Sequence, residues 1–179
     1  MNRQQLAHIL RSACRIADDE DVLVIGSQSI LGSFDETLLP ARATASIEAD
    51  IAFLDDPERA KADKVEGAIG EMSSFHANNG YYAEGIHIET AILPEGWRDR
   101  LVHWDLQSSR PAEPRFLEPH DLAVSKLIAA RDKDREFVGA LIEAKLVSVP
   151  TLIDRTKLIP DEHALRRERS LQHLQRYAD

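Results

Sequence analysis

The sequence predicts an α+β fold, with a small sheet covered by helices and a helical C-terminal half. Three observations lead to this prediction. The strand patterns all lie within residues 1–116, whereas residues 117–179 show the three- and four-residue apolar spacing of helices. A chain of 179 residues suffices for one domain with its own core. No repeat, low-complexity segment or linker divides it, so we treat 1–179 as a single domain with a sheet-containing part (1–116) and a helical part (117–179).

In the sheet-containing part, helical and strand patterns alternate. Asp55-Asp56-Pro57 is typical of a helix start, and Asn78-Asn79-Gly80 predicts a turn before a third strand. The predicted elements are a helix over 2–18, a strand over 22–25, a short helix over 27–33, a loop over 34–45, a strand over 46–54, a helix over 58–72, a strand over 85–93, a short extended piece over 101–106 and a polar loop over 107–116.

The helical part begins at Pro119, where apolar residues recur at helical steps. Pro150 opens a short helix, and Asp161 caps the final one. The predicted helices run from Pro119 to about Ala130, over about 134–146, over 150–158 and over 161–177.

Composition and net charge argue against several classes of protein. The net charge of −9 argues against broad electrostatic binding to nucleic acid, although Arg166-Arg167-Glu168-Arg169 offers a small basic surface. Cys14 is the only cysteine, which excludes an internal disulfide, and its apolar helical surroundings predict a buried thiol. No apolar run approaches membrane-spanning length, and the N-terminus lacks the apolar segment of a signal peptide. We therefore expect a cytoplasmic protein with no membrane partner.

Two carboxylates, Glu48 and Asp50, lie two residues apart in the strand predicted over 46–54. Residues at this spacing point to the same face of a strand, so the two charges repel unless a cation lies between them. Mg²⁺ commonly uses one or two carboxylates together with phosphate oxygens and water. The spacing predicts Glu48 and Asp50 as catalytic Mg²⁺ ligands that orient a nucleoside triphosphate. The alternative is the solvent face of an edge strand, where alternating charge is normal.

Gly26 and Ser27 follow the first predicted strand and precede a short helix. Glycine lets the backbone approach a phosphate closely, and the start of a helix offers amide donors to it. The Ser27 hydroxyl would donate to a phosphate oxygen. The pair is therefore predicted to bind the triphosphate, with an ordinary serine N-cap as the alternative.

Glu89 and Lys126 are the remaining candidates. Glu89 alternates with isoleucines in the strand predicted over 85–93, and we expect a third carboxylate there, acting as general base or as a further ligand. Lys126 lies on an apolar helical stripe, where a lysine either extends into solvent or reaches into a site and holds triphosphate oxygens. The sequence contains no zinc-ligand spacing, Walker A motif, GxGxxG motif or nucleophile-elbow motif.

Gly26-Ser27 followed by Glu48-x-Asp50 resembles the Gly-Gly/Ser and D-x-D/E signature of the DNA-polymerase-beta-like nucleotidyltransferase superfamily. The first carboxylate is Glu where that superfamily usually has Asp, and the gap after Ser27 is longer. Over about residues 20–146 the chain is similar to an uncharacterised bacterial family of the AbiEii-like, toxin–antitoxin-associated branch. The further patterns that carry this resemblance are Phe75-His76, Gly80-Tyr81-Tyr82, Leu93-Pro94-x-Gly96-Trp97-x-x-Arg100-Leu101, Leu117-Glu118-Pro119-His120-Asp121-Leu122-Ala123-x-x-Lys126-Leu127 and Arg131-x-Lys133-Asp134.

The resemblance implies a nucleotidyltransferase-type mixed sheet and a Mg²⁺-dependent transfer of a nucleoside monophosphate from a triphosphate to a hydroxyl. The acceptor would be an RNA, a protein or a small molecule, and the net charge disfavours long nucleic acid. The alternative is a catalytically degenerate module that binds a nucleotide or a cognate toxin or antitoxin protein. A metal-dependent phosphohydrolase built on the same carboxylates is a third, weaker hypothesis.

Overall fold

The computed structural model describes residues 1–104 and 106–177, and its centre is a five-stranded mixed sheet of strand order β3-β2-β1-β5-β4. Strand β1 runs antiparallel to β2 and parallel to β5, β3 is parallel to β2, and β4 is antiparallel to β5. This arrangement confirms the predicted α+β class. The strands are β1 (Val22–Val24), β2 (Glu48–Phe53), β3 (Tyr82–Gly85), β4 (Val102–His103) and β5 (Arg115–Phe116).

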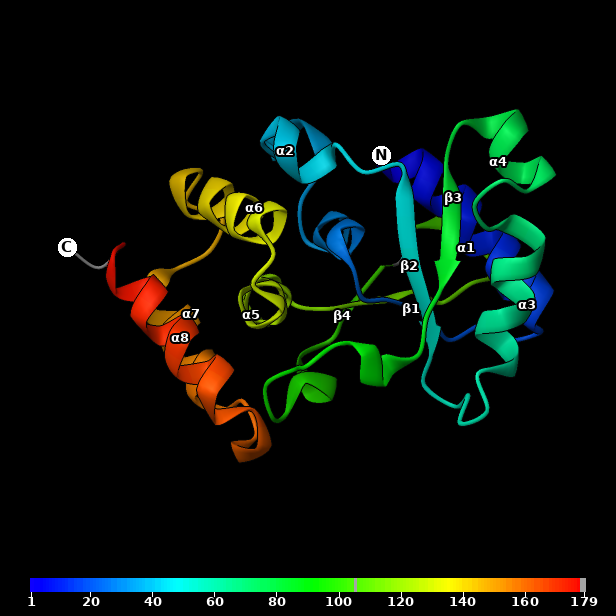
Figure 1. The fold of residues 1–179 in the computed structure, drawn as a ribbon. Helices are drawn as coiled ribbons and strands as arrows, with labels where there is room; N and C mark the ends of the chain where they lie inside the picture. The colour runs from blue at the N-terminus through cyan, green and yellow to red at the C-terminus, as the bar shows by residue number, and fades with distance from the viewer. Residues whose placement is uncertain (105, 178–179) are drawn as a thin grey trace.

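The helices form two groups. Helices α1 (Arg3–Ala17), α3 (Ala60–Ile69) and α4 (Ser74–Asn79) gather beside β2 and β3, and the C-terminal helices lie on the other side of the molecule (Figure 1). The C-terminal helices are α5 (Pro119–Ala129), α6 (Asp132–Glu143), α7 (Val149–Lys157) and α8 (Ala164–Gln175). Shorter pieces connect them: α2 (Ala41–Thr44) and the 3-10 helices η1 (Ser27–Gly32), η2 (Glu36–Leu38), η3 (Ile88–Thr90), η4 (Trp97–Arg100), η5 (Gln107–Ser109) and η6 (Asp161–His163).

Local chemistry explains where the long helices begin. The side chain of Asn2 accepts from the amide of Gln5, and the Gln5 side chain accepts from the amide of Asn2, which is a complete capping box for α1. The Glu118 carboxylate accepts from the amides of His120 and Asp121 at the start of α5, where Pro119 occupies the first helical position. These caps satisfy amides that a helix leaves unpaired at its start.

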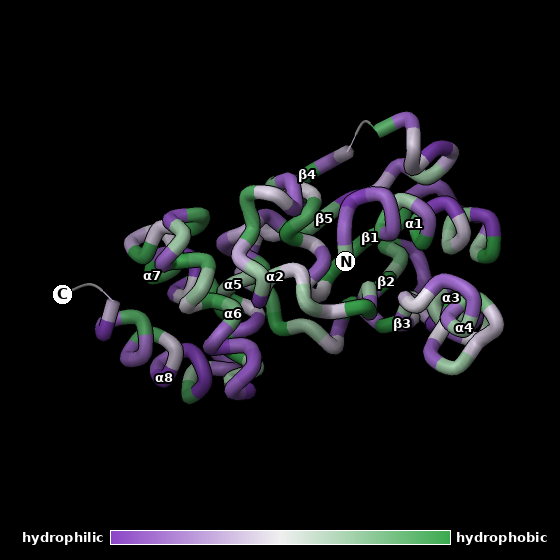
Figure 2. The backbone as a smooth tube through the Cα atoms, turned by 90° about the horizontal axis from the view of Figure 1, so that it is seen from above, coloured by the Kyte–Doolittle hydropathy of each residue, from purple (hydrophilic) through white to green (hydrophobic). Residues whose placement is uncertain are grey.

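The core surrounds β1, whose three residues are all buried. Strand β2 alternates in its first half, so Ala49 and Ile51 face the core while Glu48 and Asp50 stay partly exposed. Viewed from above, hydrophobic residues concentrate around β1 and hydrophilic ones dominate α8 (Figure 2). Among the described residues, no helix combines the length and apolar character needed to cross a membrane.

Two strand predictions were wrong. The third strand is Tyr82–Gly85 instead of 85–93, because the chain turns into η3 soon after Gly85. A Cβ on Gly85 would lie 2.0 Å from the carbonyl oxygen of Ala62, so glycine is required for the close approach of α3 to this strand end. Strand β5 is only two residues long and lies inside the predicted loop over 107–116. The predicted loop over 34–45 contains η2 and α2.

Candidate active site

Three carboxylates meet on the neighbouring strands β2 and β3. Asp50 and Glu84 are directly opposite each other in the parallel pairing of the two strands, and Glu48 lies two residues before Asp50 on the same face. One carboxylate oxygen from each residue lies within 4.8 Å of the other two. We call these three residues the acidic cluster.

The carboxylates of the acidic cluster are poorly solvated and repel one another, which raises the pKa of Asp50 and of Glu84. Burial, followed by the charge of Glu48, raises the pKa of Asp50. Burial, a hydrogen bond with the Glu48 carboxyl group and the negative charges of Glu48 and Asp50 raise the pKa of Glu84 to about 7. Low solvation and like-charge repulsion thus both favour the protonated form of these carboxyl groups. A cation bound between the carboxylates offsets both effects, because it favours the ionised form.

Tyr82 orients one member of the cluster. Its hydroxyl donates a hydrogen bond to Oε2 of Glu48 over 2.9 Å, and its ring lies against the ring of His76 with centroids 4.7 Å apart. Burial and the hydrogen bond to Glu48 raise the pKa of Tyr82. The hydroxyl therefore stays protonated and holds the Glu48 side chain as a donor.

The turn after β1 faces the acidic cluster. A Cβ added to Gly26 would lie 1.4 Å from Oδ2 of Asp50, so only glycine allows the carboxylate to reach the backbone of this turn. Ser27 follows at once as the first residue of η1 and is partly exposed. The short helix predicted here is a 3-10 helix of six residues, whose dipole is small compared with that of a long α-helix. Any phosphate binding at this turn thus depends on the Ser27 hydroxyl and on backbone amides.

Two cations from the helical part act on the acidic cluster. Lys126 of α5 and Arg131 each lower the pKa of Asp50, although burial and Glu48 outweigh them. The buried carboxylate of Asp134 fixes both cations: Arg131 donates to it over 2.6 and 3.2 Å, and Nζ of Lys126 lies 3.3 Å away. The Lys126 ammonium also lies over the ring of Phe137, 5.5 Å from its centroid. We call Lys126 and Arg131 the basic pair.

Glu89 does not lie on the strand next to Asp50. It is part of η3, its side chain is 88 % exposed, and it is not a member of the acidic cluster. Glu84, five residues earlier, takes the position that the sequence had suggested for Glu89. Sequence reasoning missed Glu84, Tyr82 and Asp134 as site residues. The pattern Tyr82-x-Glu84 has the same two-residue spacing as Glu48-x-Asp50 and would have found the first two on the parallel strand, whereas no such spacing marks Asp134 on α6.

The chemistry of the donor set suits a divalent cation. In the part of the chain that the structure describes, none of the three cluster carboxylates forms an ion pair with a lysine, arginine or histidine. An all-oxygen set at the edge of a sheet is what Mg²⁺ and other hard cations prefer, whereas zinc sites favour thiolates and imidazoles. The residues present therefore fit a divalent metal such as Mg²⁺.

Comparison with known proteins identifies the family of the chain. The profile of a family described as "Nucleotidyltransferase of unknown function (DUF6036)" matches residues 4–177 of the chain. No curated protein and no solved structure matches the chain. The family match extends over the sheet that carries the acidic cluster and over the helices that carry the basic pair. The chain therefore belongs to this nucleotidyltransferase family.

Proposed function

We propose that the protein is a metal-dependent nucleotidyltransferase that moves a nucleoside monophosphate from a triphosphate to a hydroxyl group: the hydroxyl oxygen bonds to the α-phosphorus and gives up its proton, the bond between the α- and β-phosphates breaks, and pyrophosphate leaves. The observation that carries this proposal is the acidic cluster, whose three carboxylates have no ion-pair partner among the described residues and lie between a glycine turn and a basic pair. Such an arrangement would hold a metal ion beside a phosphate-binding site, and phosphoryl transfer requires both.

Each residue has a role in this proposal. Glu48 and Asp50 hold the divalent ion, which neutralises charge on the triphosphate when it is bound. Gly26 provides space for the phosphates, and Ser27 donates its hydroxyl to one of them. Lys126 contributes a positive charge to the phosphates from the opposite side, with Arg131 beside it.

Glu84 is our candidate for the third carboxylate, in place of Glu89. It lies opposite Asp50 on β3 and is close enough either to ligate the same ion or to accept a proton from the attacking hydroxyl. A role for Glu89 in the reaction stays a prediction from the sequence, since this exposed side chain lies outside the acidic cluster.

The test is a product search with matched variants. The protein is incubated with Mg²⁺, each nucleoside triphosphate and total RNA, and mass spectrometry looks for nucleotidylated RNA, protein or small molecules. We expect transfer by the wild type, none by Asp50→Asn or Glu84→Gln, and normal transfer by Glu58→Gln, which removes an exposed carboxylate before α3. Glu89→Gln in the same series separates the two candidates for the third carboxylate.

Nucleotide binding provides the second readout. In calorimetric titrations we expect Asp50→Asn to lose Mg²⁺-dependent binding of a non-hydrolysable triphosphate while its metal-free stability holds or rises slightly, because one repulsive charge is gone. Undiminished binding by Asp50→Asn would exclude the acidic cluster as the nucleotide site.

A degenerate, non-catalytic nucleotide-binding module is the second candidate. Two observations favour it: Glu occupies position 48, and the Tyr82 hydroxyl already occupies one oxygen of that carboxylate. This candidate predicts Mg²⁺-dependent binding with no transfer product. Membership in the AbiEii-like branch and a cognate toxin or antitoxin partner belong to the same proposal, and co-purification with the product of the neighbouring gene tests them.

A further inference from the structure

A basic pocket lies between the C-terminal helices, separate from the acidic cluster. It has a volume of about 190 Å³. The end of α5, the start of α6 and one face of α8 form it, through Leu127, Ile128, Ala129, Ala130, Arg135, Arg166, Arg169, Ser170 and His173. We call it the arginine pocket. It includes two of the three arginines of the basic run that stands out in the sequence.

The positive charge of the arginine pocket is largely uncompensated. Arg166 and Arg169 are exposed and form no ion pair with any residue in the ranges 1–104 and 106–177. Arg135 pairs with Asp132 over 3.5 Å, but the Asp132 side chain is 97 % exposed, so solvent weakens that pair. Burial and the charges of Arg135 and Arg176 lower the pKa of His173, which reflects the same positive potential. On a chain of net charge −9, such a local excess points to an anionic ligand.

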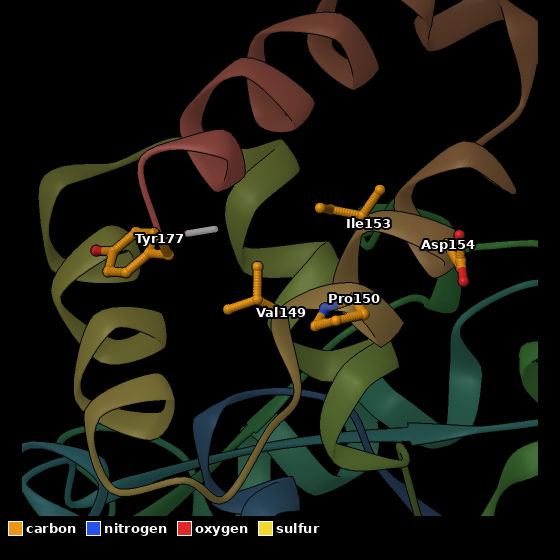
Figure 3. A pocket seen from close by; sticks show the side chains of 5 residues that line it. All are labelled: Val149, Pro150, Ile153, Asp154 and Tyr177. Carbon is orange, nitrogen blue, oxygen red and sulfur yellow. The ribbon is translucent and has the colours of Figure 1, made fainter. Parts of the chain in front are cut away.

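An aromatic side chain borders the arginine pocket. The rings of His173 and Tyr177 are in edge contact, with centroids 5.7 Å apart. Tyr177 is 38 % exposed and lines a second, mainly apolar pocket of about 390 Å³ together with Val149, Pro150, Ile153 and Asp154, whose carboxylate pairs with Lys157 (Figure 3). Sites for single-stranded nucleic acid combine two components: positively charged side chains that contact the phosphates, and exposed aromatic rings on which the bases stack. A polyanionic peptide such as polyglutamate would also pair with the arginines, but it has no base to stack on the Tyr177 ring.

We propose that the arginine pocket and Tyr177 bind a single-stranded nucleic acid, with Arg135, Arg166 and Arg169 on its phosphates and Tyr177 against a base. The proposal does not depend on catalysis at the acidic cluster. The basic pair and the arginine pocket both lie at the end of α5 and the start of α6.

Fluorescence anisotropy with labelled homopolymers of about 12 nucleotides tests this, with RNA and DNA as separate arms. The double variant Arg166→Gln/Arg169→Gln is expected to bind about tenfold or more weakly, and its salt slope between about 50 and 200 mM is expected to fall by about 1.4, or 0.7 for each lost phosphate contact. Arg166→Lys/Arg169→Lys keeps both charges and should keep most of the slope. Tyr177→Ala should weaken binding about 5- to 100-fold with the slope unchanged.

Arg15→Gln/Arg98→Gln is the matched control, since it removes two exposed arginines from other parts of the surface. We expect it to bind like the wild type. The proposal is overturned if the wild type binds neither homopolymer, if the control loses as much affinity as the pocket variant, or if polyglutamate competes as well as nucleic acid. Because the arginine pocket shares no residue with the acidic cluster or basic pair, its variants should keep Mg²⁺-dependent triphosphate binding, and Asp50→Asn should keep nucleic-acid binding.

Discussion

Two carboxylates in this protein, the buried Asp121 and the half-buried Asp50, have opposite surroundings. Asp121 of α5 is fully buried, and Arg100 donates two hydrogen bonds to it over 2.8 and 3.1 Å. Arg155 lies 3.6 Å away on the other side. Asp50 has carboxylates as its close neighbours, and the cations nearest to it are held by Asp134.

Burial raises the pKa of both groups, but the largest of the remaining contributions differs in sign. At Asp121 it is the hydrogen bond from Arg100, which opposes the rise, and at Asp50 it is the charge of Glu48, which adds to the rise and comes ahead of the opposing charges of Lys126 and Arg131. The fold thus pairs Asp121 with its own side chains and leaves Asp50 without a direct cationic partner among the described residues. This contrast distinguishes a structural ion pair from a binding site, even though burial alone would make the two aspartates look alike.

The largest effect we expect is on stability, from Asp121→Ala. A buried ion pair adds little net stability, but removal of one partner leaves charge uncompensated and usually lowers the free energy of unfolding by about 3–5 kcal/mol. We expect about 3 kcal/mol, the lower end, because the side chains of Arg100 and Arg155 are 19 % and 27 % exposed and regain some water. Urea denaturation measures the change.

Asp161→Ala is the control for this prediction. It breaks the exposed pair with Arg167, in which the Asp161 side chain is 94 % exposed, and should lower stability by less than about 1 kcal/mol. If Asp50→Asn destabilises the metal-free protein as much as Asp121→Ala does, the acidic cluster is structural and the contrast fails.

The sequence predicted some elements of the fold well and others poorly. Helices with strong apolar periodicity and clear caps, such as α1 and α5, were predicted within a few residues. Strands of two residues, such as β4 and β5, contain too few positions to show any period. Strand β3 was misplaced at both ends, because the apolar alternation of Ile86 and Ile88 lies beyond the last paired residue, whereas the paired residues Tyr82–Gly85 show no clear alternation of their own.

For the candidate site, local spacing was informative within one strand but not between strands. Glu48 and Asp50 were found because two-residue spacing fixes a common face, and the structure brings them together. The identity of their third partner depends on the register between β2 and β3, which local sequence does not encode, so Glu89 was chosen in place of Glu84. The motifs around Arg100 and Asp121, which the sequence linked to the family, meet in an ion pair in which Arg100 neutralises the buried Asp121.

The second prediction concerns the basic pair. Lys126→Met should weaken triphosphate affinity by about 1.5–3 kcal/mol, the scale of a hydrogen bond to a charged group. Stability should fall by no more than about 1 kcal/mol: the variant loses the 3.3 Å pair with Asp134 and the contact with the Phe137 ring, but Arg131 still neutralises Asp134. Calorimetric titration with a non-hydrolysable triphosphate measures the affinity. Lys133→Met, the same change at an exposed lysine of α6, is the control, and equal affinities in the two variants would remove Lys126 from the site.

The smallest expected effect is a pH dependence of metal-free stability that originates at Glu84. Its pKa is about 7 in the folded protein and 4.5 as the reference value for an unfolded chain. Between these two values the folded state retains a proton that the unfolded state has released, so stability falls as the pH rises through this window. Glu84→Gln removes the titrating group, and a plot of Tm against pH should be flatter for this variant between about pH 5 and 8, by a few degrees on the scale of a chain of this size.

Repeating the pH experiment with Mg²⁺ present tests whether the titrating carboxyl group is also the one that the metal affects. A bound cation favours the ionised form of Glu84, so in the wild type Mg²⁺ should raise Tm more at pH 8 than at pH 5, where a proton competes for the carboxylate. Glu58→Gln, a change at an exposed carboxylate outside the acidic cluster, should behave like the wild type in both respects. If Glu84→Gln leaves the slope of Tm against pH as it is in the wild type, the neighbouring carboxylates do not raise the pKa of Glu84. Asp50 would then face only Glu48, and the comparison with Asp121 would depend on two carboxylates instead of three.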